Sequence, residues 1–254
     1  MANRSELGIS AGSEALRQGP RGRGIQEKIS RSIIEVRFAV LERDAKKIAE
    51  IFCQPLTIEH LSGMAPTERT SEVNVKKYAE KYPRLNIAIA TEQGIKDLYR
   101  PYEIGQSNIA LLVAEDKNTG QVVGTVTVER PTGPGLTYAS ISRLAVEENA
   151  REKKIGGELL RSACALIFLP KEDRGYGQFG AQVGIIQDVL GYQIPQKMFQ
   201  DFGYRVIGNP VGNCVGWDSR SRRFVPRDTL FLQLQRDSFF QLHTARSLIK
   251  SLPR

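Results

Sequence analysis

The sequence predicts an α+β fold, in which helices flank one mixed, largely antiparallel sheet. Short runs that alternate apolar and polar residues indicate half-buried strands, and longer runs with apolar residues at helical spacing indicate amphipathic helices. Turn residues separate these runs, and no segment repeats. With 254 residues, of which 41% are hydrophobic and 25% charged, the chain has the composition of an ordinary globular protein and not of a largely disordered one.

The first third of the chain contains one clear strand and one clear helix. Residues 34–38 alternate as a strand does, and Asp44 is positioned to cap a helix that runs through Phe52. Residues 54–70 contain two prolines and a glycine and are predicted as a loop. Residues 71–82 fit a polar helix that Pro83 stops, whereas residues 85–107 are ambiguous.

The middle of the chain shows a hairpin, a third strand and a helix. Residues 109–115 and 121–129 are β-rich runs joined by Asp-Lys-Asn-Thr-Gly, which predicts a hairpin. Residues 137–146 follow as a strand, and residues 150–168 form a helix with an apolar stripe. The later predicted elements are an apolar run at 183–186, a helix at 195–202 ended by Gly203, strands at 204–207 and 229–234 with an exposed insertion between them, and a final amphipathic helix capped by Asp237.

Positive charge is in excess, with 36 Lys and Arg residues against 28 Asp and Glu, a formal net charge of +8. Part of the excess lies in the first 31 residues, which are rich in Gly and Ser and are predicted to be a flexible basic extension over residues 1–32. A second cluster comprises Arg220, Arg222, Arg223 and Arg227. No zinc-finger, RNA-recognition or basic-zipper pattern accompanies these clusters, so nucleic acid is not the expected partner, and a solvated surface that attracts anionic ligands is favoured.

Location is predicted from three features. No apolar run approaches the roughly 20 residues of a membrane span, and no apolar region of a signal peptide is present near the N-terminus. Three widely spaced cysteines, Cys53, Cys164 and Cys214, are predicted to be reduced thiols. A cytoplasmic protein is therefore expected.

One segment carries most of the functional signal. Residues 142–146 read Ser-Arg-Leu-Ala-Val, and residues 151–157 read Arg-Glu-Lys-Lys-Ile-Gly-Gly before a helix. A strand that feeds a turn at a helix start aims several backbone N–H groups at one point, which suits a phosphate or diphosphate. Glycines there allow a close approach to the backbone. The alternative is a plain strand–helix connection with surface lysines.

This segment resembles motif A of the GNAT N-acetyltransferase superfamily, Arg/Gln-x-x-Gly-x-Gly/Ala after a strand like Leu-Ala-Val. Arg151 and Gly156 match, Gly157 extends the pair, and Lys154 replaces the usual first glycine. Further motifs similar to the family's follow its order over about residues 34–235: Val36-Arg37-Phe38-Ala39 with Asp44-Ala45 and Ile48, Leu112-Val113-Ala114-Glu115 with Gly124-Thr125-Val126, Phe199 to Tyr204 with Gly208, and Arg227 to Leu230.

The resemblance implies an acyltransferase domain over residues 33–236, followed by an amphipathic helix over residues 237–254. It implies an acyl-CoA co-substrate, most simply acetyl-CoA, and direct transfer of the acyl group to a primary amine. A strand splayed away near residues 183–186 would open the slot for the thioester. The implied cofactor-binding residues are Leu144, Ala145, Val146, Arg151, Glu152, Lys153, Lys154, Ile155, Gly156 and Gly157.

The acid and base of the reaction are less defined by the resemblance. Many relatives carry a tyrosine in the late helix, where this chain has Phe199, which has no proton to give. The candidate catalytic residues are Tyr192 as acid, Glu129 as base, and His60 in a loop that often borders the acceptor. A packed aromatic, a solvated carboxylate and a surface histidine are the respective structural alternatives. No metal is expected.

Three functions remain open at this level. The first is an N-acetyltransferase that acts on a small-molecule or protein amine. The second is a longer-chain acyltransferase resembling N-acyl amino acid or acyl-homoserine-lactone synthases, for which an acidic acyl carrier protein would be a partner. The third is a non-catalytic module that senses CoA. The acceptor and the oligomeric state, including a homodimer, are left open.

Overall fold

The fold is described from a computed structural model. The residues that it describes are 33–66, 80, 88–103, 108–131, 137–187, 189, 191–209, 214–243 and 252–253. The predicted N-terminal extension and most of the predicted helix at 71–82 lie outside these residues. No helix in the described part of the chain has the length and apolar character that crossing a membrane requires.

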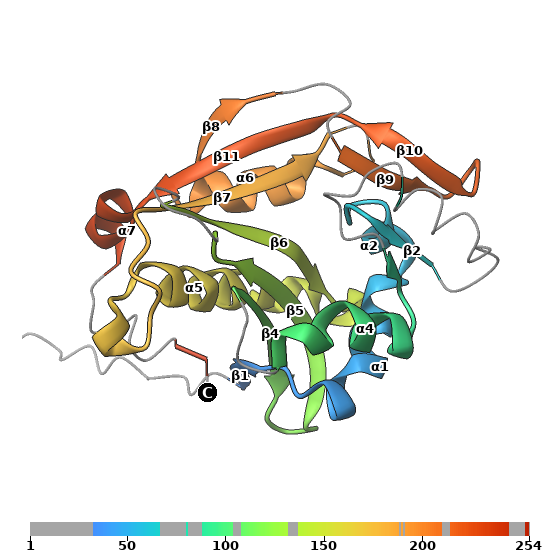
Figure 1. The fold of residues 1–254 in the computed structure, drawn as a ribbon, viewed down its shortest axis with the longest axis horizontal. Coiled ribbons are helices and arrows are strands. Elements are labelled where there is room, and N and C mark those ends of the chain that lie inside the picture. The colour runs from blue at the N-terminus through green and yellow to red at the C-terminus, as the bar shows by residue number, and fades with distance from the viewer. Residues whose placement is uncertain are drawn as a thin grey trace, which may run out of the picture. The chain divides into compact units, whose positions relative to one another are not determined.

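Seven strands form one sheet in the order β1-β4-β5-β6-β7-β11-β8, as Figure 1 shows. Neighbouring strands are antiparallel except β6 and β7, which run parallel. The strands of this sheet are β1 (Ile34–Phe38), β4 (Ile109–Asp116), β5 (Gln121–Glu129), β6 (Tyr138–Val146), β7 (Gly180–Ile186), β8 (Arg205–Gly208) and β11 (Thr229–Gln235). The predicted mixed, largely antiparallel α+β sheet is confirmed.

Helices cover both faces of the sheet (Figure 1). One face packs on α5 (Ile155–Phe168), α6 (Gln193–Asp201) and α7 (Arg236–Leu242), and the other packs on α1 (Leu41–Phe52) and α4 (Glu92–Glu103). Alternate residues of β4 therefore enter different cores: Leu112 lies in the α5 core and Val113 in the α1 core. Because both of its faces are buried, β4 is apolar almost throughout.

Shorter elements complete the described chain. They are α2 (Pro55–Ile58), β2 (Met64–Ala65), β3 (Ala88–Ile89), the 3-10 helices η1 (Glu148–Lys153) and η2 (Lys171–Asp173), and the hairpin strands β9 (Cys214–Asp218) and β10 (Arg223–Arg227). The predicted loop at 54–70 thus holds a helical turn and a short strand. The ambiguous region 85–107 holds β3 and all of α4.

The start of α1 differs from the prediction. The helix begins at Leu41, and Asp44 is not its N-cap. Asp44 instead lies in the first turn and accepts a hydrogen bond from the N–H of Val40, the actual N-cap residue, at 2.8 Å. A side chain inside the first turn can satisfy this amide as well as a preceding residue can.

The last third of the chain also contains two corrections. The insertion between β8 and β11 is not simply exposed, since Trp217 and Phe224 of the β9–β10 hairpin are 4% and 2% exposed. The final helix begins after Gln235 and ends at Leu242 in the described chain, so Asp237 lies inside it. In the hairpin, burial of Trp217 and Phe224 among residues of distant segments decided the structure.

Candidate functional site

The parallel strands β6 and β7 separate part of the way along their length. They pair only from Tyr138 with Gly180 to Ile141 with Val183, although β6 continues to Val146 and β7 to Ile186. Within the described chain, the β7-facing edge of residues 142–146 therefore has no pairing strand. Figure 1 shows the two strands diverging toward their C-terminal ends. A strand edge without a partner offers backbone N–H and C=O groups to an extended ligand.

A bulge in β6 lies where the strands separate. Thr125 and Thr127 of β5 pair with Ala145 and Ser142, so two residues of β6 lie opposite Val126 alone. Arg143, one of these two, has a φ of +50°, which is rare for a residue with a Cβ. Such bulges leave one residue outside the ladder and redirect its side chain. The sequence does not indicate this bulge, because Ser-Arg-Leu contains none of the residues that typically mark one.

The predicted helix at 150–168 is two helices with a break at Lys154. Residues of η1 form the first, and α5 starts after Lys154, whose φ of +60° and ψ of +15° are left-handed. This conformation favours glycine, which explains why motif A usually has glycine at this place. Lys153 and Lys154 are both exposed.

The first turn of α5 presents backbone donors. The first hydrogen bond of this helix runs from the N–H of Glu158 to the carbonyl of Lys154, at 3.2 Å. The N–H groups of Ile155, Gly156 and Gly157 precede it and have no acceptor within the helix. No side chain caps this end of α5 in the described structure. These donors and the positive end of the helix dipole form an anion-binding geometry.

The two glycines of this turn have different surroundings. A Cβ built on Gly157 would meet nothing within 4 Å, so the space in front of this residue is open. A Cβ on Gly156 would lie 3.2 Å from Sδ of Met198 on α6. Gly156 is therefore constrained by helix packing, whereas only Gly157 borders open space.

Arg151 has a structural role that was not predicted. Its guanidinium donates to Oγ1 of Thr57 at 2.9 Å and to the carbonyl of Val146 at 3.4 Å. The side-chain oxygen of Gln54 accepts a hydrogen bond from the N–H of Glu148 at 3.0 Å. The segment around α2 thus fixes the turn between β6 and α5 from about 94 residues away in sequence.

Phe199 of α6 is a core residue. It is 2% exposed and packs edge-on against Tyr204, with ring centroids 5.1 Å apart. The hydroxyl of Tyr204 lies 3.4 Å from Sγ of Cys164, and burial raises the pKa of Tyr204 well above its ordinary value. Burial also raises the pKa of Cys164 to about 12, so neither group exchanges a proton near neutral pH. Cys164 is therefore a buried core residue.

The three candidate catalytic residues lie on different elements. Glu129 ends β5 opposite Ser140, one pair before the strands separate, and shares a face with Thr127, which points away from α5. Tyr192 is half-buried and immediately precedes α6. His60 is half-buried in the turn after α2, and its N–H donates to Thr57. Of the three, Glu129 has a described position near the separation of β6 and β7, through its pairing with Ser140.

This chain is similar to known proteins in sequence and in fold. Residues 77–170 match the model of the acetyltransferase (GNAT) family. A search of curated protein sequences gives no significant match. Several solved structures are similar to this chain. Ribosomal-protein-S5-alanine acetyltransferase from Vibrio fischeri is 15% identical, with a TM-score of 0.55 over 81% of this chain and 94% of the other.

The second is the spermidine/spermine N-acetyltransferase SpeG from Vibrio cholerae, 10% identical, with a TM-score of 0.56 over 83% of this chain and 98% of the other. The third is a putative phosphinothricin N-acetyltransferase, 19% identical, with a TM-score of 0.52 over 80% and 98%. At these identities the likeness concerns the fold. Residues 77–170 therefore match the acetyltransferase (GNAT) family, and the chain has the fold of solved N-acetyltransferases.

Proposed function

We propose that this protein transfers the acetyl group of acetyl-CoA to a primary amine of a small molecule or protein, by direct attack of the amine. The observation that carries the proposal is the separation of β6 from β7 directly before a helix start with unused backbone donors. Relatives of this fold are described as acting on a ribosomal protein, on spermidine or spermine, and on phosphinothricin, so both acceptor classes are included.

Several described residues support binding of an acyl-CoA. Backbone amides between Glu152 and Gly157 hold the diphosphate, and the exposed Lys153 and Lys154 add charge attraction. Open space in front of Gly157 leaves room for the diphosphate next to the backbone. The unpaired edge of β6, from Leu144 through Ala145 to Val146, pairs with the pantetheine arm as a strand would. Arg151 contributes mainly by fixing the turn through Thr57.

Catalysis in this arrangement depends on positioning. Acetyl-CoA, when bound, supplies the activated acyl group as a thioester. The amine nitrogen forms a bond to the carbonyl carbon, the C–S bond breaks, and CoA leaves as the thiolate. Glu129, or His60 through water, takes the proton that the amine loses, and Tyr192 supplies a proton to the thiolate. Phe199 has no proton to give, and Tyr204 is buried in the core. Tyr192, which immediately precedes α6, is therefore the candidate acid.

The substitution Gly157→Val is expected to impair acetyl-CoA binding while leaving the folded protein stable. Because a Cβ at this position meets no atom, the melting temperature of the ligand-free variant should stay within a few degrees of the wild type. The side chain would fill the space in front of the amides, so the stabilisation by acetyl-CoA, about 2.7 kcal/mol at 100 times its Kd, should be lost. Gly208→Val on β8 is a matched control, since its Cβ also meets nothing within 4 Å and it lies on an edge strand.

Retention of full acetyl-CoA binding by Gly157→Val would refute the proposed diphosphate site at the start of α5. Catalysis is tested by thiol release from acetyl-CoA and from longer acyl-CoA donors with a panel of small amines and peptides. A preference for long acyl chains, or for acyl carrier protein, would favour the longer-chain alternative. Tight binding without turnover of any donor would favour a non-catalytic module.

A further inference from the structure

We propose that the β9–β10 hairpin is an arm that selects polypeptide acceptors carrying an acidic segment, through Arg220, Arg222 and Arg223. This inference rests on the proposed transferase function and concerns its acceptor. Three features support it: the position of the hairpin, the packing of its base and the exposed arginines at its tip.

The hairpin lies beside the separated end of β7. Gly216 of β9 forms a bridge with Ser62, and the N–H of Gly63 donates to the carbonyl of Val215 at 2.8 Å. A Cβ built on Gly216 would lie 3.3 Å from Cδ1 of Ile186, the last residue of β7. Figure 1 shows the hairpin above α2 and β2, at the end toward which β6 and β7 diverge. An acceptor that reaches the separated strands from this end passes the hairpin.

The base of the hairpin is rigid. The buried rings of Trp217 and Phe224 pack edge to face, with centroids 5.7 Å apart and an interplanar angle of 85°. Arg227, 8% exposed, donates to the carbonyl of Trp217 at 3.0 Å. In the turn, the carboxylate of Asp218 accepts hydrogen bonds from the N–H and the hydroxyl of Ser221. These contacts restrain the tip, and such restraint lowers the entropic cost of recognition.

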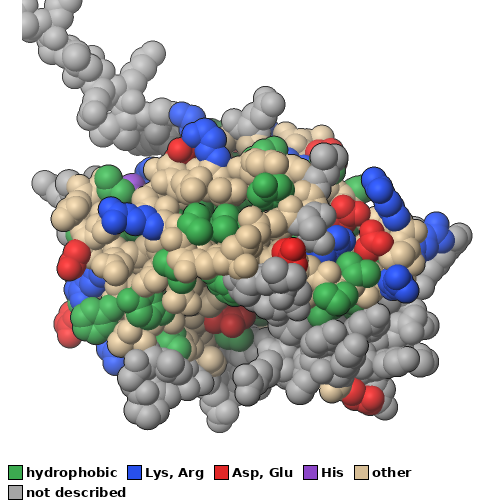
Figure 2. Space-filling view, turned by 90° about the horizontal axis from the view of Figure 1, so that it is seen from above, with side chains coloured by type: hydrophobic (Ala, Val, Ile, Leu, Met, Phe, Trp, Pro, Cys, Tyr) green, Lys and Arg blue, Asp and Glu red, His purple; other side chains and the backbone are tan. Residues whose placement is uncertain are grey.

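Three arginines lie at the tip of the hairpin, and Arg223 is opposite Asp218 in the strand register. Arg220, Arg222 and Arg223 are exposed, and no ion pair joins them to a carboxylate in the described structure. Asp218 is already engaged by Ser221. Figure 2 shows several Lys and Arg side chains at the end of the molecule where Figure 1 places the hairpin. Guanidinium groups bind carboxylates through paired hydrogen bonds, and the same charges repel polycations.

The observations favour an acidic polypeptide over nucleic acid. Trp217 and Phe224, the aromatic residues of the hairpin, are buried and cannot stack on bases. Pro226 lies in β10 and has no N–H to donate to an added strand, so recognition proceeds through side chains and not through strand pairing. An acidic segment some residues away from the acceptor amine would place the amine at the separated strands while its carboxylates bind the tip.

The test uses two peptides with the same acceptor amine, one with three Glu residues after a short spacer and one with three Gln residues in their place. The full-length protein should show a KM about tenfold lower for the Glu peptide, since each exposed pair contributes only a small factor. Raising the salt concentration from 0.05 to about 0.5 M should remove most of this preference, because screening shortens the range of surface charges.

Charge reversal assigns the effect to the hairpin. Arg220→Glu with Arg223→Glu should abolish or invert the preference and retain the acetyl-CoA-induced rise in melting temperature. The matched control is Lys171→Glu with Arg174→Glu, the same charge change on two exposed residues at the far end of α5, and it should keep the wild-type ratio. Anisotropy of a labelled Glu peptide measures binding without requiring turnover.

Several results would overturn the inference. One is equal binding of the two peptides, and another is a preference that survives the hairpin reversal or disappears in the control. Hairpin-dependent binding of an RNA duplex, without a preference between the peptides, would assign the arm to nucleic acid. Absence of an acetyl-CoA shift and of turnover with either peptide would refute the transferase function instead, while anisotropy would still test the hairpin.

Discussion

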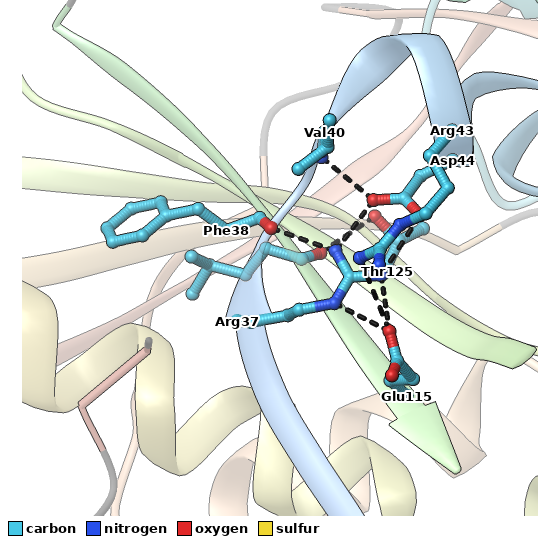
Figure 3. A network of polar contacts seen from close by, with 8 residues as sticks. Arg37, Phe38, Val40, Arg43, Asp44, Glu115 and Thr125 are labelled. Atoms are coloured by element: carbon cyan, nitrogen blue, oxygen red, sulfur yellow. Dashed lines mark hydrogen bonds and ion pairs between the residues drawn. The ribbon is translucent and has the colours of Figure 1, made fainter. Parts of the chain in front are cut away.

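The ion pair between Arg37 and Asp44 is expected to be a major determinant of stability. Asp44 is 2% exposed, and its two carboxylate oxygens accept hydrogen bonds from Arg37 at 2.6 and 2.9 Å (Figure 3). Arg37 also forms an ion pair with Glu115 at 2.6 Å. The N–H of Val40 donates a further hydrogen bond to the carboxylate of Asp44. The contacts join β1, α1 and β4, which are separate in sequence.

Replacing Arg37 with Met should destabilise the protein by about 3–5 kcal/mol, because the carboxylate of Asp44 stays buried without its main partner. Arg43, 3.1 Å from Asp44, is too exposed to replace it, with a side chain 56% accessible. For a domain of this size the loss corresponds to a decrease in melting temperature of about 10 °C. Urea denaturation at pH 7, followed by circular dichroism, measures it. Arg37→Lys should retain part of the stability and serves as the control.

The pH dependence gives an independent check. Burial alone would raise the pKa of Asp44, but hydrogen bonds from Arg37 and Val40 outweigh it and hold the pKa below the ordinary 3.8. The stabilisation is therefore complete above the pKa of the unfolded chain and is lost as the pH falls through the lower folded value. In Arg37→Met the carboxyl should protonate more easily, so the difference from the wild type should shrink below about pH 4. A variant within 1 kcal/mol of the wild type at pH 7, or a pH-independent difference, would refute this reasoning.

Further substitutions test the start of α5 and the residues that pack around it. Lys154→Gly should raise the free energy of unfolding by about 1 kcal/mol, because glycine adopts a φ of +60° without strain, whereas Lys154→Ala should give no such gain; equal thermal shifts for both would contradict the assignment. Phe199→Tyr should cost about 1–3 kcal/mol by placing a hydroxyl in the core, and a rise in thiol release would show that the ring faces the substrate instead. Thr57→Val removes the acceptor of Arg151 and should weaken acetyl-CoA binding severalfold in calorimetry; unchanged affinity would show that the turn holds its conformation without α2.

Local sequence patterns predicted much of the fold and of the proposed CoA site. Alternation indicated β1, two β-rich runs joined by a turn indicated β4 and β5, and the strand–turn–helix motif with Gly156 and Gly157 indicated the first turn of α5. These features depend on neighbouring residues only, so periodicity and turn chemistry can reveal them. The order of several weak motifs identified the family, which the match at residues 77–170 confirms.

Features that depend on distant residues could not be inferred in this way. The contact of Arg151 with Thr57 spans 94 residues, and the limited space at Gly156 comes from Met198 on another helix. The burial of the β9–β10 hairpin arises from its packing against residues 61–65, although its own sequence is rich in arginine and serine. The sequence by itself thus determined the order and type of most elements and the chemistry of the helix start. The tertiary structure decided which side chains are hydrogen-bonded or packed within the protein and which can contact a ligand. The physical reason is that burial and hydrogen bonding are set by the whole folded chain and not by local spacing.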